Sequence, residues 1–565
     1  MVENQKNRGY KKGLDKTHRR REETSIRLRK SKKEDCLSKR RRNQNINSTT
    51  PTNGGSSPSS LNDNDNDNDN DNDNDIMNTN PIISYTKTNI PSLAQTITSP
   101  NSDEASIAKA LKGFRKLVSI EDDPPIKAIL DKNLLQTFVK FLSHPSNPTI
   151  IFESAWVLTN LASSNQFDAT KLVANSGAVP IFIKLLDHEI PDIREQVAWC
   201  LGNIAGDNVR FRNAVQKAGI LSGLTKNIIH PANPSLFRTV TWTLSNLCRG
   251  KPQVSTSHLP QLTPLVRQCL QSEDIEVLVD ACWAASYLSD GENERIKICQ
   301  NEVGLTERLI HLMEAESSTL STPALRAVGN FCTGEEAETQ LVIDSGVLRG
   351  ILRLLDEDNQ KTRTRKEAAW LLSNIAAGNP AQVEALFTAF ESRSRGDLVK
   401  QLCHLSLNDV WEVRKEATWA IANICDSGTK EQISLMVEFG GLSALCGMLN
   451  CHDVLVTTTV LDAISAILKA KAGTSYTNLV EECDGLEEIE NLQQHENEGI
   501  YLKAQKILEK YFGAEEEEFE DENLCPGIGG DGKTFGFGIG IGGGGSKIPP
   551  AIPTPSFKFN FSSIQ

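Results

Sequence analysis

The stretch AWCLGNIA, residues 198–205, recurs with small changes six more times along the 565-residue chain. The other copies begin at residues 155, 241, 282, 325, 369 and 418, and they read AWVLTNLA, TWTLSNLC, CWAASYLS, LRAVGNFC, AWLLSNIA and TWAIANIC. Successive copies are 41 to 49 residues apart, and the longest interval contains the insertion FESRSRG at 390–396. A period of about 40 to 47 residues made of short helical patterns is typical of armadillo and HEAT solenoids.

A second pattern precedes many of these copies. SGAVPIFIKLL at 176–186 and AGILSGLTKNI at 218–228 each place Gly just before an apolar pattern with helical spacing. Gly adopts the left-handed conformation that ends a helix, so each unit is expected to contain several short helices. Such breaks favour the three-helix armadillo unit over HEAT. We predict an all-α, right-handed armadillo solenoid of about ten repeats, with one concave groove.

Charge and composition divide the chain into four segments. Residues 1–42 hold 17 Lys or Arg against 6 Asp or Glu, a net +11, whereas the whole chain carries −13. We expect a basic arm at 1–45, a disordered Asn/Asp-rich linker at 46–100, an armadillo body at 101–512, and an acidic, then Gly-rich, flexible tail at 513–565. A basic arm on an acidic body predicts an acidic partner for the arm and basic partners for the body.

The sequence also indicates the compartment. The 13 Cys residues show no C-x-x-C pair, and several lie inside apolar helical patterns, which is typical of buried thiols in a reducing environment. No secretory signal and no run of about 18 apolar residues is present. We therefore expect a soluble protein of the cytosol, the nucleus or both, without a membrane partner.

Five repeats place Asn four residues after Trp, as in Trp156 and Asn160. These side chains share one helix face. Because Asn is costly to bury without a partner, we expect the pair to line an exposed groove rather than the core. Trp rings can hold the stems and cations of Lys and Arg, and Asn can bond a peptide backbone. The gaps between successive Trp rings form slots for these side chains, and Asp207, Glu367 and Glu416 are placed as acids at the slot ends. The predicted ligand is therefore an extended Lys/Arg-rich peptide.

The pattern is interrupted in its middle. Tyr287 stands in place of Asn after Trp283, and Arg326 stands in place of Trp before Asn330. A cation at 326 is expected to repel a basic peptide locally. The groove is therefore expected to contain a larger site on one side and a smaller site on the other, suited to two basic clusters joined by a spacer.

At this level of detail the chain resembles the importin-α (karyopherin-α) family of nuclear localisation signal receptors. The resemblance rests on the seven repeat copies, including their Tyr and Arg exceptions, and on RRREETSIRLRKSKKEDCLSKRRR at 19–42. It implies a major signal-binding site at Trp156, Asn160, Trp199, Asn203, Asp207, Trp242 and Asn246. It implies a minor site at Arg326, Asn330, Trp370, Asn374, Glu416, Trp419 and Asn423. Ser164 departs from the Gly that is usual near the first major pocket.

The resemblance also implies partners. The arm would bind importin-β through Arg19, Arg20, Arg21, Arg27, Arg29, Lys30, Lys32 and Lys33. Four further cations would act as an autoinhibitory pseudo-cargo, namely Lys39, Arg40, Arg41 and Arg42. Cargo bearing a basic signal would cross the nuclear pore with importin-β, and an export receptor with Ran-GTP would return the adaptor. The chain would then shuttle between cytoplasm and nucleus and pass the nuclear envelope transiently.

Other functions have weaker support. GIGGDGKT at 527–534 satisfies the P-loop spacing but lacks the flanking strand and helix pattern that phosphate binding needs. No metal-ligand spacing, cofactor site or catalytic arrangement is visible, so we expect neither an enzyme nor a metalloprotein. The acids within the arm argue against direct nucleic-acid binding. A structural armadillo scaffold of the catenin or vacuolar type remains the alternative, although residues 101–512 carry 39 Lys or Arg against 52 Asp or Glu.

Overall fold

The computed structural model describes residues 85–120, 123–164, 166–389, 395–470 and 474–513, together with 527–528 and 535–536. The chain divides into two compact units, residues 1–511 and 512–565. Within the second unit, β1 (Gly527–Ile528) pairs antiparallel with β2 (Phe535–Gly536), with Gly527 opposite Gly536. The first unit contains the repeats, and all of its described elements are helical.

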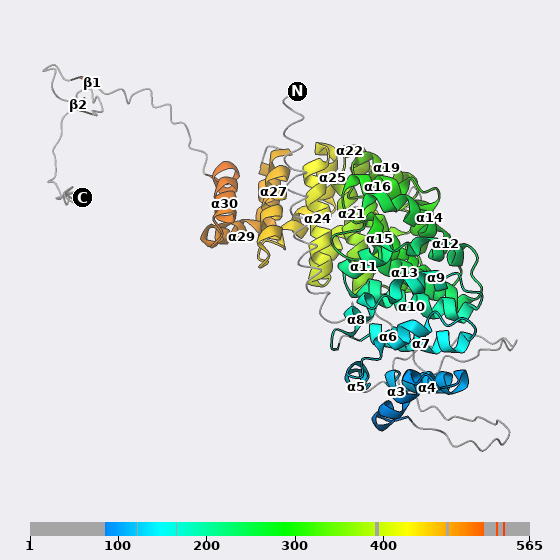
Figure 1. The fold of residues 1–565 in the computed structure, drawn as a ribbon. Coiled ribbons are helices and arrows are strands. Elements are labelled where there is room, and N and C mark those ends of the chain that lie inside the picture. The colour runs from blue at the N-terminus through cyan, green and yellow to red at the C-terminus, as the bar shows by residue number, and fades with distance from the viewer. Residues whose placement is uncertain are drawn as a thin grey trace, which may run out of the picture. The chain divides into compact units, whose positions relative to one another are not determined.

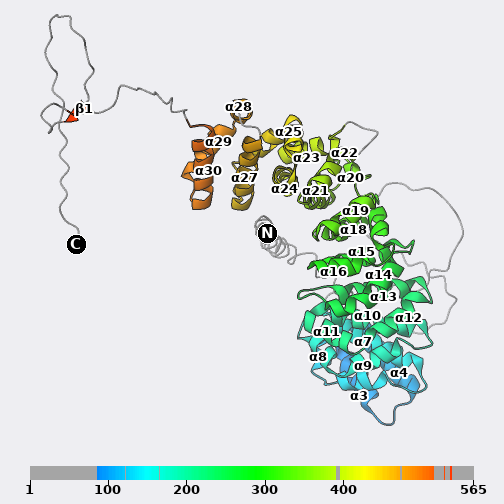
Figure 2. The same cartoon turned by 90° about the horizontal axis from the view of Figure 1, so that it is seen from above.

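Among the described residues of the first unit, ten long helices follow one another, and each packs against the next in chain order (Figure 1, Figure 2). These third helices of the repeats are α4 (Glu104–Val118), α7 (Pro148–Ala162), α10 (Pro191–Asp207), α13 (Pro234–Cys248), α15 (Ile275–Ser289), α18 (Ser318–Phe331), α21 (Thr362–Ala376), α24 (Trp411–Ser427), α27 (Val454–Ala470) and α30 (Glu498–Tyr511). The all-α armadillo solenoid of about ten repeats is thereby confirmed.

Shorter helices precede each third helix. They are η1 (Lys87–Asn89), α3 (Ile90–Thr98), α5 (Ile126–Leu130), α6 (Leu135–Phe141), α8 (Ala169–Asn175), α9 (Ala178–Leu185), α11 (Val209–Lys217), α12 (Ile220–Ile229), η2 (Thr256–His258), α14 (Leu259–Cys269), α16 (Asn293–Gln300), α17 (Leu305–Met313), α19 (Glu336–Asp344), α20 (Ile351–Leu354), α22 (Pro380–Thr388), α23 (Asp397–Asn408), α25 (Lys430–Glu438), α26 (Gly441–Cys446), α28 (Thr474–Glu482), α29 (Gly485–Asn491) and η3 (Leu492–Gln494).

Local sequence signals set the ends of these helices. Gly177 and Gly219, with φ of 87° and 95°, separate α8 from α9 and α11 from α12, as the sequence predicts. Asn147 and Asn233 cap α7 and α13 by accepting hydrogen bonds from backbone N–H groups of the first turn, and Pro follows each cap. The boundaries that define the three-helix unit therefore have local physical causes.

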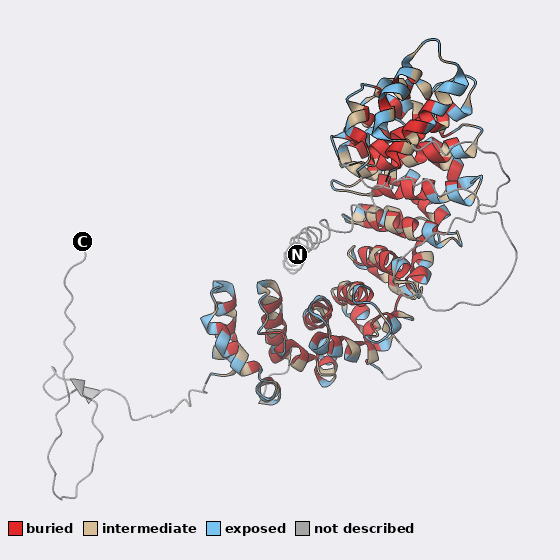
Figure 3. Ribbon diagram, turned by 90° about the horizontal axis from the view of Figure 1, so that it is seen from below, coloured by how far each residue is buried: buried red, intermediate tan, exposed pale blue. Residues whose placement is uncertain are grey.

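The core extends through successive layers of the stack, because each third helix buries residues against both of its neighbours (Figure 3). Leu158 and Leu201 are fully buried in consecutive layers. The thiols of Cys200, Cys282 and Cys332 are buried and free, in agreement with the sequence interpretation. Burial raises the pKa of each of these thiols well above its usual range, so they behave as small apolar groups.

The expected linker at 46–100 ends earlier than the sequence analysis proposed. Its last part forms η1 and α3, and α3 buries Ile90, Ala94 and Ile97. Helix α3 packs on α4 at Gly113, where an added Cβ would lie 3.0 Å from both methyl groups of Leu93. The four- and three-residue spacing of the apolar side chains gives α3 one buried face, so the ordered body begins before residue 101.

Candidate peptide-binding groove

The residues of the predicted major and minor sites occupy equivalent positions on consecutive third helices. Trp156, Trp199 and Trp242 lie on α7, α10 and α13, and Arg326, Trp370 and Trp419 lie on α18, α21 and α24. We call these positions, together with Trp283 on α15 and the residue four places after each, the ladder. The rings of Trp199 and Trp242 are neighbours, with centroids 6.2 Å apart. The structure thus brings the predicted residues of each site onto adjacent helices.

The ladder Asn residues connect one repeat to the one before it. The side-chain Nδ2 of Asn203 donates to the Thr159 carbonyl at 3.3 Å, and that of Asn246 donates to the Gly202 carbonyl at 3.1 Å. The same bond recurs from Asn330, Asn374 and Asn423, at 2.9, 3.1 and 2.8 Å, to the carbonyls of Ser286, Gly329 and Ser373. Each acceptor is the residue directly before the ladder Asn or Tyr of the preceding repeat.

These bonds correct the expectation that Asn must be exposed. Asn160, Asn203, Asn246 and Asn330 are buried, whereas Asn374 and Asn423 are half-buried. Burial is tolerated because each amide finds an acceptor about one repeat away, which is the Ser119 hydroxyl at 2.9 Å for Asn160 and a backbone carbonyl for the others. Asn374 and Asn423 each use one of two N–H donors in this bond, so a donor and the amide oxygen have no partner among the described residues.

The Trp rings are also more buried than expected. Trp242 is 1% exposed and Trp370 is 9% exposed, whereas Trp199 and Trp283 are half-buried. Two of these rings, Trp242 and Trp370, pack over a glycine of the preceding repeat. A Cβ added at Gly202 would lie 2.4 Å from Cζ3 of Trp242, and one added at Gly329 would lie 2.3 Å from Cζ3 of Trp370. The missing Cβ atoms therefore set how deeply these rings lie.

Cations of the chain itself already lie over ladder rings. The guanidinium carbon of Arg115 is 4.4 Å from the ring centroid of Trp156, and that of Arg326 is 5.0 Å from the ring centroid of Trp370. Both arginines also pair with buried carboxylates, at 2.5 Å to Glu153 and 2.5 Å to Glu367. Burial raises the pKa of Glu153, and the adjacent Arg115 opposes that rise. The ring faces thus accept guanidinium groups.

The predicted acids of the site differ in their surroundings. Glu367 pairs with Arg326 at 2.5 Å, so this predicted slot-end acid is engaged by the chain itself and the charge of Arg326 is neutralised. Asp207 ends α10 and accepts a bond from Nδ2 of Asn208 at 2.7 Å. Glu416 is 8% exposed, and its Oε2 atom has no hydrogen-bond partner among the described residues. The described residues therefore leave one buried carboxylate oxygen of Glu416 unsatisfied.

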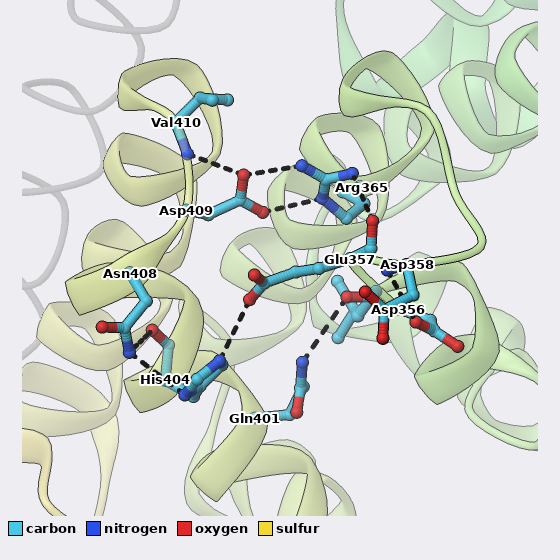
Figure 4. A network of polar contacts seen from close by, with 10 residues as sticks. Asp356, Glu357, Asp358, Arg365, Gln401, His404, Asn408, Asp409 and Val410 are labelled. Atoms are coloured by element: carbon cyan, nitrogen blue, oxygen red, sulfur yellow. Dashed lines mark hydrogen bonds and ion pairs between the residues drawn. The ribbon is translucent and has the colours of Figure 1, made fainter.

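A polar network holds α21 against the next repeat (Figure 4). Arg365 donates from Nε and Nη2 to the two carboxylate oxygens of Asp409, both at 2.7 Å, and the two side chains are 9% and 2% exposed. His404 lies 3.1 Å from Glu357 in the same network. A bidentate, buried pair fixes geometry as well as charge, so the turn of α21 that leads to Trp370 is held in place.

Several predictions fall outside what the structure describes. The importin-β-binding residues of the arm and the stretch Lys39–Arg42 lie in residues 1–84, and most of the insertion lies at 390–394. Across the described part of the chain, no helix has the length and apolar character needed to cross a membrane. The same residues contain no group of three or more His, Cys, Asp or Glu side chains placed to hold a metal ion.

Sequence reasoning missed three features of the groove. It did not identify Arg115, which stacks on Trp156, nor Arg363, whose guanidinium carbon lies 5.3 Å from the ring centroid of Trp283. It also missed the carbonyl acceptors. One signal was available, because the residue before the ladder Asn or Tyr is always small: Thr159, Gly202, Ser245, Ser286, Gly329, Ser373 and Ala422.

Comparison with protein families gives three matches. Residues 4–109 match the importin beta binding domain. Residues 122–163, 167–206 and 336–377 match the armadillo/beta-catenin-like repeat, and residues 474–527 match an atypical Arm repeat. The first match covers the basic arm, and the others cover parts of the repeat array.

Relatives that align over most of the chain agree with these family matches. The chain is 38% identical to importin subunit alpha-4 of Arabidopsis thaliana, across 90% of this chain and 91% of that protein. It is 35% identical to the probable importin subunit alpha-A of Dictyostelium discoideum, across 93% and 95%. The crystal structure of an engineered protein superposes with a TM-score of 0.66 at 25% identity, covering 74% of this chain and 98% of that protein. These relatives favour a transport adaptor over the scaffold alternative.

Proposed function

The chain belongs to the importin-α family, and from this premise we propose that its ladder binds an extended Lys/Arg-rich nuclear localisation signal while its basic arm binds importin-β. The protein is a nuclear import adaptor, and its chemistry is recognition rather than catalysis. The described helices supply the surface for the signal, whereas the family match at residues 4–109 assigns importin-β binding to the other end of the chain.

One observation carries the assignment of the signal to the ladder. Guanidinium groups of the chain lie over the rings of Trp156 and Trp370, which supports the proposal that ladder rings of both sites can stack on the cation of a ligand Arg or Lys. Such contacts contribute about 0.5 to 2 kcal/mol each. Because an extended peptide advances about 3.3 Å per residue and packed helices lie about 8 to 10 Å apart, successive slots suit every third ligand residue.

The proposed major site extends from Trp156 to Asn246, and the proposed minor site extends from Arg326 to Asn423. At the major site, Asp207 lies one turn after Asn203 and supplies the carboxylate. At the minor site, the free Oε2 of Glu416 and the unused amide groups of Asn374 and Asn423 can bind a side-chain cation and the ligand backbone. A signal with two basic clusters would occupy both sites.

We also propose that the arm regulates cargo binding. Lys39–Arg42 is itself a basic cluster of the type that the ladder would bind, so it competes with cargo until importin-β binds the arm. Ran-GTP then releases importin-β in the nucleus, and an export receptor with Ran-GTP returns the chain to the cytoplasm. This cycle of partners and compartments follows from family membership.

The test uses the full-length chain and a fluorescent peptide with one cluster of Lys and Arg, with an alanine-substituted peptide as the matched control. Anisotropy titrations are run with and without saturating importin-β. We expect binding of the basic peptide alone, and tighter binding when importin-β is present. Equal, weak binding of both peptides under both conditions would refute the proposed function.

A further inference from the structure

Arg363 contacts a ladder ring that belongs to another repeat. It lies in the first turn of α21, yet its guanidinium carbon is 5.3 Å from the ring centroid of Trp283 on α15, with α18 between them in the stack. Arg363 is exposed, and no hydrogen bond or ion pair engages its side chain among the described residues. The Trp283 ring is therefore the one contact of these kinds that this cation makes within them.

The exception at position 326 leaves the Trp283 ring open to Arg363. Elsewhere the next ladder residue is a ring, as where Trp242 lies 6.2 Å from Trp199. After Trp283 the next ladder residue is Arg326, which turns the other way to pair with Glu367 and lie over Trp370. The Trp283 ring also stacks on the ring of Tyr287 from its own helix, with the two centroids 5.9 Å apart.

Helix geometry directs Arg363 to the ladder side. It precedes Trp370 by seven residues, or two helical turns, and so lies on the same face of α21. Arg365 is only two residues away and lies on a different face, where its bidentate pair with Asp409 anchors this end of the helix (Figure 4). The anchored turn thus presents Arg363 to the ladder.

The position is distinctive within this chain. In the other repeats, the residue seven places before the ladder Trp, or before Arg326, is neutral or acidic: Thr149, Asp192, Ser235, Glu276, Thr319 and Glu412. Arg363 is the only cation of the series. Because the other members are short or negatively charged, none of them can fill a ring slot in the manner of a ligand Lys or Arg.

We propose that Arg363 is a specificity-determining residue that closes the Trp283 slot to cations of the ligand and makes the middle of the groove select a neutral or acidic spacer. The inference rests on the proposed function. A guanidinium uses its face on the ring and keeps its N–H groups at its edge, where they can bind a carboxylate of the spacer. A Lys in the spacer would instead meet a like charge and an occupied ring.

The test uses full-length chain with importin-β saturating, so that the arm is occupied in every sample. Peptides carry two basic clusters joined by a neutral spacer of about nine residues, which matches the three repeats from Trp242 to Trp370. A single Lys, Ala or Asp is placed at each spacer position in turn. Affinities are measured for the wild type, for Arg363→Ala and for Arg363→Gln. Lys361→Ala is the matched control, because it removes another exposed cation, at the start of the same helix, that makes no ring contact among the described residues.

At one or two spacer positions we expect the wild type to bind the Asp peptide about 5- to 10-fold more tightly than the Lys peptide. Both Arg363 variants should lose this preference, and Lys361→Ala should keep it. If the Arg363 variants and Lys361→Ala give the same position profile, Arg363 does not determine specificity, even though one-cluster peptides still bind. If a one-cluster peptide fails to bind the wild type, the proposed function fails first.

Discussion

Replacing Gly329 by Ala is expected to weaken the minor site without affecting the major site. The added Cβ would lie 2.3, 2.8 and 3.2 Å from Cζ3, Cε3 and Cη2 of Trp370, whereas ordinary contacts begin near 3.4 Å. The ring must therefore move by about 1 Å, away from a fully packed helix interface. The cost in stability is about 1 to 3 kcal/mol, as is typical of overpacking in a core.

The displacement also changes binding. Trp370 lies at the centre of the proposed minor site, and its ring already holds Arg326 on one side. If the ring loses its contact with a ligand cation, the loss is about 0.5 to 2 kcal/mol, or about 2- to 30-fold in the affinity of a two-cluster peptide. A one-cluster peptide, which needs only the major site, should bind as it does to the wild type.

The assay is peptide anisotropy on full-length protein, with thermal unfolding followed by circular dichroism. Gly202→Ala is the mirror-image variant, because its Cβ would lie 2.4 Å from Trp242 of the major site. It should weaken the one-cluster peptide. Gly499→Ala, in the exposed first turn of α30, controls for the general effect of Ala in a helix. The reasoning would be refuted if the Gly329 and Gly202 variants weakened both peptides equally while remaining folded.

Three further predictions concern charges. Asp207→Lys should weaken a one-cluster peptide by more than about 2 kcal/mol, roughly 30-fold, in the same anisotropy assay, because a cation would replace the proposed slot-end acid. Changing Lys39–Arg42 to Ala should strengthen cargo-peptide binding about 10- to 100-fold without importin-β, and an equal affinity would exclude internal competition. Burial opposes ionisation of Asp453, but hydrogen bonds from Lys415 and from the N–H groups of Leu455 and Val456 outweigh it and lower its pKa. Asp453→Asn should therefore lower the melting temperature above about pH 4, and the difference should vanish as the pH falls through the lowered pKa.

The sequence by itself determined the features that depend on near neighbours along the chain. The 41- to 49-residue period, the Gly breaks and the Trp and Asn spacing are local patterns, and each predicts the type and register of a helix. Because most repeats share these local patterns, the sequence alone predicts the armadillo architecture, and the two exceptions predict where the ladder divides into two halves. The predicted linker boundary lies too late in the sequence, because the short apolar pattern of α3 directly follows a long polar segment.

Only the tertiary structure decided which groups meet across repeats. Asn203 bonds a carbonyl 44 residues away, Glu367 pairs with Arg326, and Arg363 reaches Trp283 across an intervening helix. These partners depend on how far one helix is shifted and rotated on the next, and side chains packed over Gly202 and Gly329 set that arrangement. Spacing within a helix fixes the face on which a residue lies, but packing between helices fixes what that face touches.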